Sequence, residues 1–402
     1  MDKAPWLTII GLGEDGLAGL SNASKEALAG AEIVTGAARH LSLLPDLTAQ
    51  TRPWPVPFVD GIEQLLALRG RTVVVLASGD PFWYGAGSIL AQHLDTDEWQ
   101  AFPSPSVVSL AAAYLGWPLE KTAVFGLHAA PLSRLRPALQ PGVNLLVLLR
   151  DGPAASNLAT YLVQQGFGAS CLWIMESLGG PRERVRITTA QSLDFDDISH
   201  PVCAAMALAG DGLALPLSSG LADSFFDHDG QITKRPMRAV TLSSLAPLAG
   251  QHLWDIGAGS GAIGIEWMLA HPSNQTTAIE PNPTRAARIR RNAVALGTDL
   301  LNLVESTGLD FLNRLPQPTP PNAVFIGGGL SEQLLQRLWT ILPKGTRLVA
   351  NSVTLETDGL LAQWQRDVGG DLMRFDIANS TPLGAKRGWK AAFPVTQWSV
   401  LK

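Results

Sequence analysis

The chain of 402 residues is longer than one hydrophobic core usually covers, so we expect about two or three domains of ~100–200 residues. Its 46% hydrophobic and 16% charged residues exclude a disordered or fibrous protein. A net charge of −5 argues against a nucleic-acid partner, and it means that a polyanionic ligand must be met by locally placed arginines.

The sequence predicts neither a membrane partner nor a metal site. The longest apolar runs, such as residues 145–149, are far shorter than the ~18 residues that a spanning helix needs. Residues 1–5 contain no basic signal-type region, so we expect a cytoplasmic protein. Cys171 and Cys203 each lie in an apolar stretch without a CxxC partner. We interpret both as buried free thiols, with a disulfide or metal role as the alternative.

The first half of the chain alternates short apolar, β-branched runs with helical stretches, which is typical of an α/β domain. Strands are predicted at residues 6–10, 32–35, 72–76 and 144–149, and a helix at 21–28. The sequence WLTIIGLGEDG, residues 6–16, is a literal G-x-G-x-x-G after a strand. However, the helix begins only near Ser21, and the second strand ends in Thr35-Gly36 without an acid for a ribose. Both departures disfavour a dinucleotide site.

Two further loops of small residues follow in the same half. The loop LASGDPFWYGAG, residues 76–87, comes after a buried strand. The sequence PSPS, residues 103–106, precedes a helix. Together with the first loop, they favour a ligand that is held mainly by backbone groups, because small residues let the chain approach a ligand closely.

The second half begins after a segment rich in Gly, Asp, Ser and Pro, which suits a linker with a boundary near Gly220. A new alternation then predicts a second doubly wound sheet. Its strands are expected at residues 252–256, 276–280, 301–305, 323–327 and 347–351, and its helices at 262–270 and 283–296. Residues 391–402 are interpreted as a closing strand with a proline near its start, which favours an edge or hairpin position.

The strongest local pattern is HLWDIGAGSGAIGIEW, residues 252–267, where a strand is followed by three glycines and a helix. Glycines let the backbone pass close to a ligand, and the start of the helix offers unpaired N–H groups. The next strand ends in Glu280, 19 positions after Gly261, where a carboxylate can accept both hydroxyls of a ribose. This combination predicts an adenosine-containing ligand.

A glycine loop with an acid at the end of the next strand suits both a dinucleotide such as NAD and S-adenosylmethionine. The order of residues in the loop distinguishes the two ligands. The order here is Asp-x-Gly-x-Gly-x-Gly, whereas a dinucleotide site has G-x-G-x-x-G. The carboxylate of Asp255 would repel a pyrophosphate but tolerates the cationic methionine end of S-adenosylmethionine, which we therefore favour over NAD. Glycines needed only for helix packing are the other alternative. Residues 327–329 are three glycines that suit the floor beneath a flat substrate, or form an ordinary loop.

The three N-terminal loops together resemble the tetrapyrrole methyltransferase family, which carries a G-x-G-P-G loop, a G-D-P loop and a P-x-x-S segment. The match runs over residues 6–206. Glu14 and Asp15 stand where the family commonly has Pro-Gly, so no role is carried over to them. The resemblance implies a two-lobed fold, methylation of carbon 5 of the macrocycle, and donor contacts at Gly11, Gly13, Gly79, Asp80 and Ser106.

Residues 225–261 are similar to the decarboxylating precorrin methyltransferase domain. This resemblance implies a Rossmann-like class I domain that methylates carbon 15 and removes carbon dioxide from the ring C acetate. The expected domains are 1–208 and 221–402, joined by a linker at 209–220. The resemblance implies one S-adenosylmethionine per domain and the conversion of precorrin-6B to precorrin-8 on the route to cobalamin. It also implies a homo-oligomer.

Pattern and resemblance together give a C-terminal donor site of Thr233, Asp255, Gly257, Ala258, Gly259, Ser260, Gly261, Glu280 and Gly308, with Thr307 where the domain often has Asp. Arg and Lys forks suit the carboxylates of the macrocycle. The candidate substrate contacts are Lys234, Arg235, Arg238, Gly328 and Arg387, with solvated surface charge as the alternative for the cations. His228, between two aspartates, is a candidate proton donor after decarboxylation or else a loop residue.

Two other functions stay open at this point. One is a tetrapyrrole methyltransferase fused to a methyltransferase for another substrate, which the long loop DHDGQITKR and the glycine floor argue against. The other is a non-catalytic protein that binds the donor or carries a product, which the departure at Glu14 and Asp15 makes conceivable for the first half.

Overall fold

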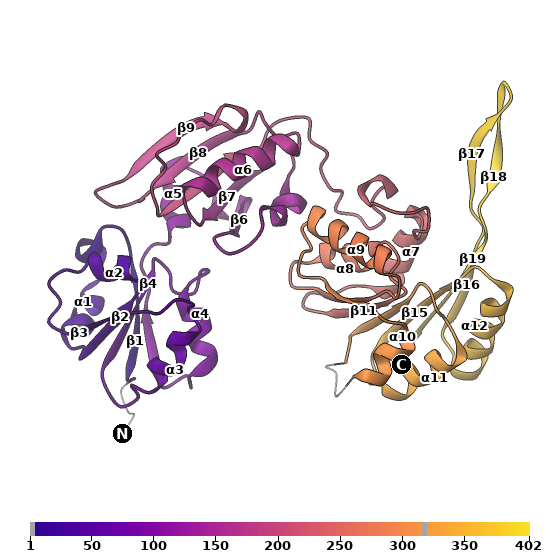
Figure 1. The fold of residues 1–402 in the computed structure, drawn as a ribbon, viewed down its shortest axis with the longest axis horizontal. Helices are drawn as coiled ribbons and strands as arrows, with labels where there is room; N and C mark the ends of the chain where they lie inside the picture. Colours follow the sequence, from indigo (N-terminus) through magenta and orange to yellow (C-terminus); the bar gives the residue numbers. More distant parts are fainter. Residues whose placement is uncertain (1–4, 316–319) are drawn as a thin grey trace. The chain divides into compact units, whose positions relative to one another are not determined.

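The computed structural model describes residues 5–315 and 320–402, so most of the segment 1–5, expected to carry no signal sequence, lies outside the described residues. The chain divides into two compact units. The first comprises the residues up to Leu132 together with Ala138–Leu213, and the second comprises Ser133–Pro137 and Ala214–Lys402. Each unit is an α/β structure, as predicted (Figure 1).

The first unit begins with a parallel sheet of order β3-β2-β4-β1-β5. Its strands are β1 (Leu7–Leu12), β2 (Ile33–Gly36), β3 (Gln50–Pro53), β4 (Val73–Ser78) and β5 (Trp99–Phe102). Alternate side chains pack on opposite faces, where α1 (Asn22–Ala29) and α2 (Ala38–Ser42) cover one and α3 (Asp60–Leu66) and α4 (Ala86–Leu90) the other. Because the strands are parallel, the loops after β1 and β4 leave the sheet at the same edge.

A second sheet in this unit is mixed and has the order β6-β7-β10-β8-β9. Its strands are β6 (Thr122–Gly126), β7 (Asn144–Leu149), β8 (Cys171–Glu176), β9 (Arg184–Thr189) and β10 (Val202–Ala207). Helix α5 (Val107–Leu115) packs on one face, and α6 (Gly152–Gln164) completes this lobe. The short 3-10 helices of the unit are η1 (Gly16–Gly19), η2 (Ala91–His93), η3 (Leu119–Lys121) and η5 (Ala190–Ser192), and η4 (Leu132–Ala138) spans the division between the units.

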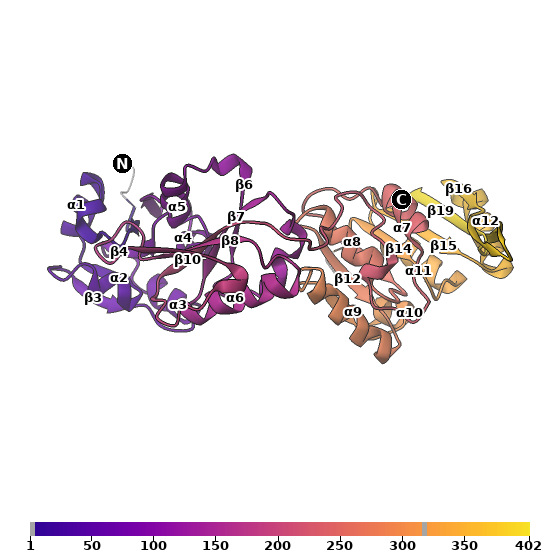
Figure 2. The ribbon, with the colours of Figure 1, turned by 90° about the horizontal axis from the view of Figure 1, so that it is seen from above.

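The second unit contains a sheet of seven strands in the order β13-β12-β11-β14-β15-β19-β16. These are β11 (His252–Ile256), β12 (Gln275–Ile279), β13 (Asn302–Val304), β14 (Ala323–Ile326), β15 (Arg347–Ser352), β16 (Asp371–Phe375) and β19 (Val395–Leu401). Trp254 and Ile256 of β11 face α10 (Gly308–Arg314), α11 (Glu332–Ile341) and α12 (Leu355–Val368), whereas Leu253 faces α7 (Arg235–Leu245) and α8 (Ala262–Ala270). Helix α12 contacts β15, β16 and β19 (Figure 2).

Helices begin where the sequence supplies a capping side chain. Ser21, Ser106 and Asp151 accept a hydrogen bond from the first turn of α1, α5 and α6, and Asn282 does so at α9 (Pro283–Ala295). The predicted bounds of β7, β11 and α8 are confirmed. The short helix η6 (Asp223–Phe225) lies in the segment that precedes α7.

Of the two positions predicted for the closing strand, edge or hairpin, the edge position is wrong. Strand β19 pairs with β15 on one side and β16 on the other, so it is interior to the sheet. Pro394 lies just before the strand and therefore removes no hydrogen bond from the ladder. The hairpin of β17 (Ala378–Leu383) and β18 (Lys386–Ala391) was not predicted, and it extends away from the body of its unit in Figure 1.

Both cysteines are free. Burial raises the pKa of the Cys203 thiol to about 12, which makes it unreactive at neutral pH. Cys171 is only half-buried, so the prediction of complete burial is wrong for this thiol. Among the residues that the structure describes, no helix is long and apolar enough to cross a membrane. Over the same residues, no group of three or more His, Cys, Asp or Glu side chains is placed to hold a metal ion.

Candidate functional site

The glycine loop after β11 has a positive φ at each of its three glycines, Gly257, Gly259 and Gly261. Gly257 and Gly259 have φ values of +69° and +60°, which β-branched side chains rarely adopt. A Cβ on Gly257 would lie 2.6 Å from the backbone N of Gly328, so the loop after β14 packs directly against it. Next to Gly259, the nearest atom is the carbonyl oxygen of Gln231 at 3.7 Å, which leaves open space for a ligand. The structure thus brings Gly257 and Gly328 together, as the predicted site requires.

Glu280 stands directly after β12 and faces this loop. One carboxylate oxygen accepts a hydrogen bond from the Gly259 N–H at 2.8 Å, and the other accepts one from the Asn282 N–H at 3.0 Å. Its side chain is buried. A carboxylate can accept about four hydrogen bonds, so Glu280 can hold the loop and still accept from ribose hydroxyls. The residues present therefore fit the adenosine end of S-adenosylmethionine.

Asp255 makes a structural hydrogen bond, and its contact with the donor stays a prediction. Its carboxylate accepts a hydrogen bond from the Gly264 N–H of α8 at 3.0 Å and is 1% exposed. Burial raises its pKa to about 7, and the nearby charge of Glu280 acts in the same direction. Oδ2 therefore joins β11 to α8, whereas Oδ1 is buried and has no hydrogen-bond partner among the described residues.

A buried asparagine connects the segment before α7 to the glycine loop. The side-chain amide of Asn292, on α9, donates to the carbonyl oxygens of Asp227 and Ser260, each at 2.9 Å. Its own carbonyl oxygen accepts from the Asp227 N–H at 2.8 Å. On the same helix, Arg285 forms an ion pair with Asp229 at 3.0 Å. Sequence reasoning missed this role of α9, although the arginine-rich helix and the DHD sequence were visible as complementary charges.

Three other predicted residues lie around the same loop. A Cβ on Gly308, the first residue of α10, would lie 2.6 Å from Cγ2 of Ile256, so the helix starts against the end of β11. Thr233 lies two residues before α7, and its carbonyl oxygen accepts a hydrogen bond from Arg238. His228 accepts a hydrogen bond at Nδ1 from the Gly230 N–H at 3.0 Å, which makes it a turn residue and gives no support to a role as proton donor.

The prediction that Arg238 contacts substrate is wrong. Its side chain is 0% exposed and forms ion pairs with Glu266 at 2.7 Å and Asp223 at 2.8 Å. It also donates to the carbonyl oxygens of Leu221 and Thr233. A guanidinium with these partners has no face left for a ligand, so it stabilises the start of the second unit instead.

The other candidate cations remain on the surface. Lys234 and Arg235 are exposed at the beginning of α7, and the amine of Lys234 lies 3.9 Å from a carboxylate oxygen of Asp223. Arg387 is on β18 and donates to Ser380 across the hairpin. Because that hairpin extends away from the sheet, Arg387 does not join the other predicted contacts within one chain (Figure 1).

In the first unit, the three predicted loops meet at Gly11. A Cβ there would lie 1.7 Å from the carbonyl oxygen of Gly79 and 2.7 Å from the backbone N of Ser104. The Ser104 hydroxyl donates to the Gly11 carbonyl at 2.7 Å. Asp80 accepts from the Phe82 N–H, and Ser106 caps α5, so both polar side chains also shape the loops. The three segments therefore lie together, and their role as one donor site stays a prediction.

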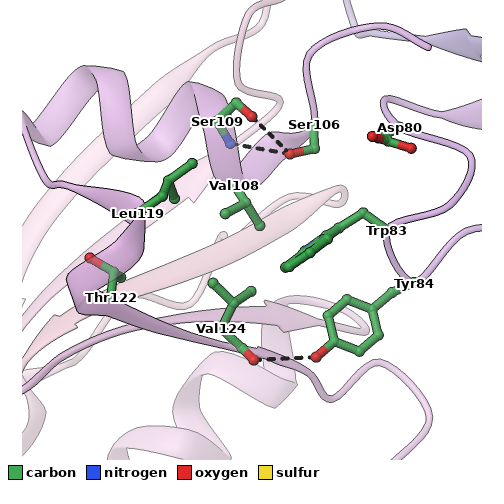
Figure 3. A pocket seen from close by; sticks show the side chains of 9 residues that line it. All are labelled: Asp80, Trp83, Tyr84, Ser106, Val108, Ser109, Leu119, Thr122 and Val124. Atoms are coloured by element: carbon green, nitrogen blue, oxygen red, sulfur yellow. Dashed lines mark hydrogen bonds between the residues drawn. The ribbon is translucent and has the colours of Figure 1, made fainter.

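A cavity of about 800 Å³ opens beside these loops and is lined from both sheets of the unit. Gly13, Gly79 and Ser106 line it, together with apolar side chains such as Leu110 and Met175. A smaller pocket of about 320 Å³ shares Trp83, Tyr84 and Ser106 with it. Figure 3 shows Trp83 and Tyr84 reaching from the loop after β4 toward Val108 and Val124, where the Tyr84 hydroxyl donates to the Val124 carbonyl at 3.2 Å.

One group of charged and polar side chains at the large cavity was not predicted. Arg39 forms an ion pair with Glu14 and donates to the Ser78 hydroxyl at 3.0 Å. Nε2 of His40 lies 2.9 Å from the same hydroxyl. Burial, reinforced by the charge of Arg39, lowers the pKa of His40 to about 4, so this imidazole is neutral at physiological pH. The residues come from separate segments, so no local sequence pattern indicates the cluster.

Comparison with known proteins identifies two families and several relatives. Residues 6–194 match the tetrapyrrole (corrin/porphyrin) methylases, and residues 224–402 match a precorrin methyltransferase domain. A precorrin-6Y C(5,15)-methyltransferase [decarboxylating] from Sinorhizobium sp is 47% identical over 99% of this chain and 97% of its own length. A cobalt-precorrin-7 C(5)-methyltransferase from Salmonella typhimurium is 27% identical over 47% of this chain and 94% of its own length. A probable cobalt-precorrin-6B C(15)-methyltransferase (decarboxylating) from Saccharolobus solfataricus is 31% identical over 34% of this chain and 71% of its own length.

Proposed function

The chain belongs to the family of decarboxylating precorrin-6Y C(5,15)-methyltransferases, and on that premise we propose that each of its two units performs one of the two methyl transfers. It is an enzyme of cobalamin biosynthesis that methylates a precorrin at carbons 5 and 15 and decarboxylates it. Its first unit has the tetrapyrrole methylase fold, and its second unit has a Rossmann-like fold.

The observation that supports one methyl transfer in each unit is that each unit has its own glycine-loop site. The first unit, in domain 1–208, methylates carbon 5, and the second, in domain 221–402, methylates carbon 15 and releases carbon dioxide. Two shorter relatives, each named for only one of these carbons, support the separation of the two methyl transfers. Carbon 15 is methylated first in this proposal, which the names of the relatives support: one is named for carbon 15 of a cobalt-precorrin-6B and the other for carbon 5 of a cobalt-precorrin-7.

Each site fits one molecule of S-adenosylmethionine, which supplies an electrophilic methyl group when bound. In the second unit, the open space at Gly259 and the carboxylate of Glu280 receive the adenosine end. In the first unit, the loops around Gly11 and Gly79 present backbone groups to the cavity. Neither site needs a metal ion for this transfer.

The chain promotes the transfer mainly by orientation. A methyl transfer in line requires the accepting carbon at about 3–3.5 Å from the methyl group, and holding that geometry supplies much of the rate. The apolar walls of the large cavity, with Leu110 and Met175, exclude water around the macrocycle. Decarboxylation breaks the bond between the carboxylate and the methylene carbon of the ring C acetate, and carbon dioxide leaves. The electron pair of that bond enters the conjugated macrocycle, so the substrate serves as its own electron sink, and a proton then completes the methyl group.

A homo-oligomer, a cytoplasmic location and the absence of nucleic-acid and membrane partners remain part of the proposal. The exposed hairpin supports self-association, because Trp389 and Leu383 on it are 79% and 69% exposed. Large apolar side chains held away from their own core favour contact with another surface.

Mass spectrometry of the products tests the function. The full chain, incubated with precorrin-6B and S-adenosylmethionine, is expected to yield a product with two added methyl groups and one carboxyl group fewer. If the mass is unchanged although the donor binds, a non-catalytic donor-binding role replaces the proposal.

A further inference from the structure

Glu14 occupies the position after the first glycine loop where the family commonly has proline, and it is buried between two arginines. Its carboxylate pairs with Arg39 on one oxygen and with Arg182 on the other, the second at 3.3 Å. The side chain of Glu14 is 7% exposed, whereas those of Arg39 and Arg182 are 24% and 65% exposed. The buried acid is thus flanked by cations that solvent can reach.

The charges of this cluster do not balance. Two guanidinium groups share the single carboxylate of Glu14, and no other carboxylate of residues 5–315 and 320–402 lies within 4.0 Å of either. The neighbouring His40 and His200 add no negative charge, and burial lowers the pKa of both imidazoles. Burial and the charge of Arg182 also lower the pKa of Arg39. One further carboxylate would neutralise the excess and offset this cost.

The cluster also lies where the two lobes of the first unit approach each other at the cavity. Arg39 is on α2, in the lobe of the first sheet, and lines the cavity. Arg182 is on the connection between β8 and β9, in the other lobe. That connection touches Glu14, because a Cβ on Gly180 would lie 2.5 Å from the Cβ of Glu14. A ligand that bridges the two arginines therefore contacts both lobes.

We propose that Arg39 and Arg182 bind one side-chain carboxylate of the tetrapyrrole, and that Glu14 neutralises one of their two positive charges. This assignment rests on the function proposed above, since it requires a polycarboxylate in the cavity. Arg39 is the single Arg or Lys side chain that lines the cavity among the residues that the structure describes, so it is the charged anchor in otherwise mostly apolar walls. Its planar guanidinium can hold a carboxylate through two parallel hydrogen bonds. Glu14 leaves room for one carboxylate and makes the site unfavourable for two.

The test measures carbon 5 methylation in the full chain, with the decarboxylated, singly methylated intermediate as substrate. We expect Arg39→Gln to raise the KM for this tetrapyrrole roughly 10- to 100-fold, the range of a lost hydrogen bond between charged groups. Arg182→Gln, at a more exposed side chain, should raise it about threefold to tenfold. The KM for S-adenosylmethionine should stay within about twofold, since the donor makes no contact with this cluster in the proposal. Arg39→Lys should recover part of the loss because it keeps the charge.

Two controls separate binding from folding. The first control is Arg71→Gln, which removes an exposed arginine that pairs with Glu32 at 3.0 Å. Arg71 lies just before β4, at the opposite end of the strand from Ser78, the residue that contacts Arg39. This variant should behave like the unchanged chain. Decarboxylation and carbon 15 methylation in the same chain report on the second unit, and they should be unaffected by all of these variants.

Glu14→Gln should change the KM for the tetrapyrrole in the opposite direction, and it tests whether the excess positive charge of the cluster binds the substrate. It leaves two positive charges without a carboxylate, so the KM for the tetrapyrrole should fall. A KM that rises as in Arg39→Gln would show that the pair only builds the loop and would overturn the proposal. Unchanged tetrapyrrole KM values in both Arg39→Gln and Arg182→Gln would also overturn it. Failure of the unchanged chain to methylate carbon 5 would instead refute the proposed function.

Discussion

Single residues decide which atoms the second unit can bring close to a ligand. Gly259 leaves open space beside a backbone N–H that Glu280 holds in place. The same reasoning from spacing and side-chain type predicted Gly257, Gly259 and Glu280 together, because glycine and acid positions follow local chain geometry. It failed for Arg238, because the burial of an arginine depends on distant partners, here Glu266.

Gly259→Val is expected to abolish donor binding in the second unit. Valine is strained at a φ of +60°, and its side chain would fill the space that the loop leaves open. We expect a loss of affinity for S-adenosylmethionine at this site of at least about 100-fold, or ~3 kcal/mol. Calorimetry on the full chain measures it by the disappearance of one of two binding events. Gly359→Val is the matched control, because Gly359 is at an exposed position of α12 where an added Cβ would meet no atom of another segment within 4 Å. Unchanged affinity in Gly259→Val would mean that the donor binds elsewhere.

His40 makes the stability of the first unit sensitive to acid. Its pKa is lowered to about 4 in the folded chain, against 6.5 for the free side chain, so between these values only the unfolded chain holds the proton. Its contribution is therefore complete above pH 6.5 and is lost as the pH falls toward 4. At pH 5 we expect a loss of roughly 2 kcal/mol relative to pH 7. The measurement is the free energy of unfolding of the first unit at both pH values. His40→Gln should show a smaller loss, and an equal loss in both chains would contradict the burial of this imidazole.

At the scale of elements, regular strands and helices with a clear period were predictable from the sequence. Strand β11 and helix α8 have the bounds that the alternation of residues indicates. The position of β19 in the sheet was not predictable in this way, since the order of strands depends on long-range pairing with β15 and β16. The hairpin of β17 and β18 was also not predicted, because its residues are mostly exposed and form no apolar face that would give an alternating pattern.

Helix α9 should control how tightly the second unit binds its donor. Asn292 on this helix makes three hydrogen bonds that join Asp227 to the glycine loop at Ser260. Asn292→Ala removes all three and leaves buried backbone groups without partners, at a cost of about 1–3 kcal/mol. We expect the KM for S-adenosylmethionine in carbon 15 methylation to rise about tenfold, with carbon 5 methylation unchanged.

Asn302→Ala is the control for this substitution, because among the described residues its side-chain amide makes a single long hydrogen bond, to Thr277 at 3.3 Å. If both alanine variants raise the KM equally, the effect comes from general loosening of the unit, and α9 has no special role in holding the loop.

At the scale of the whole molecule, two complete α/β units lie in one chain, each with its own sheets, core and glycine loops. In the proposed reaction, joining them keeps two successive steps on one polypeptide. The sequence alone indicated both sites. It could not indicate the cluster of Glu14, Arg39 and Arg182, because those residues lie far apart in the chain and meet only in the folded unit.

The division of labour is tested most directly by two full-length variants used in sequence. Gly13→Val fills the donor end of the first cavity, where its Cβ would meet the flexible side chain of Asp15, and Gly259→Val blocks the second unit. From precorrin-6B, the Gly13→Val chain should yield a product that has lost one carboxyl group and gained one methyl group, and the Gly259→Val chain should leave precorrin-6B unchanged. The purified product of the first chain should then gain its second methyl group from the second chain. Loss of decarboxylation in a folded Gly13→Val chain, or its persistence in Gly259→Val, would contradict the assignment of one reaction to each unit.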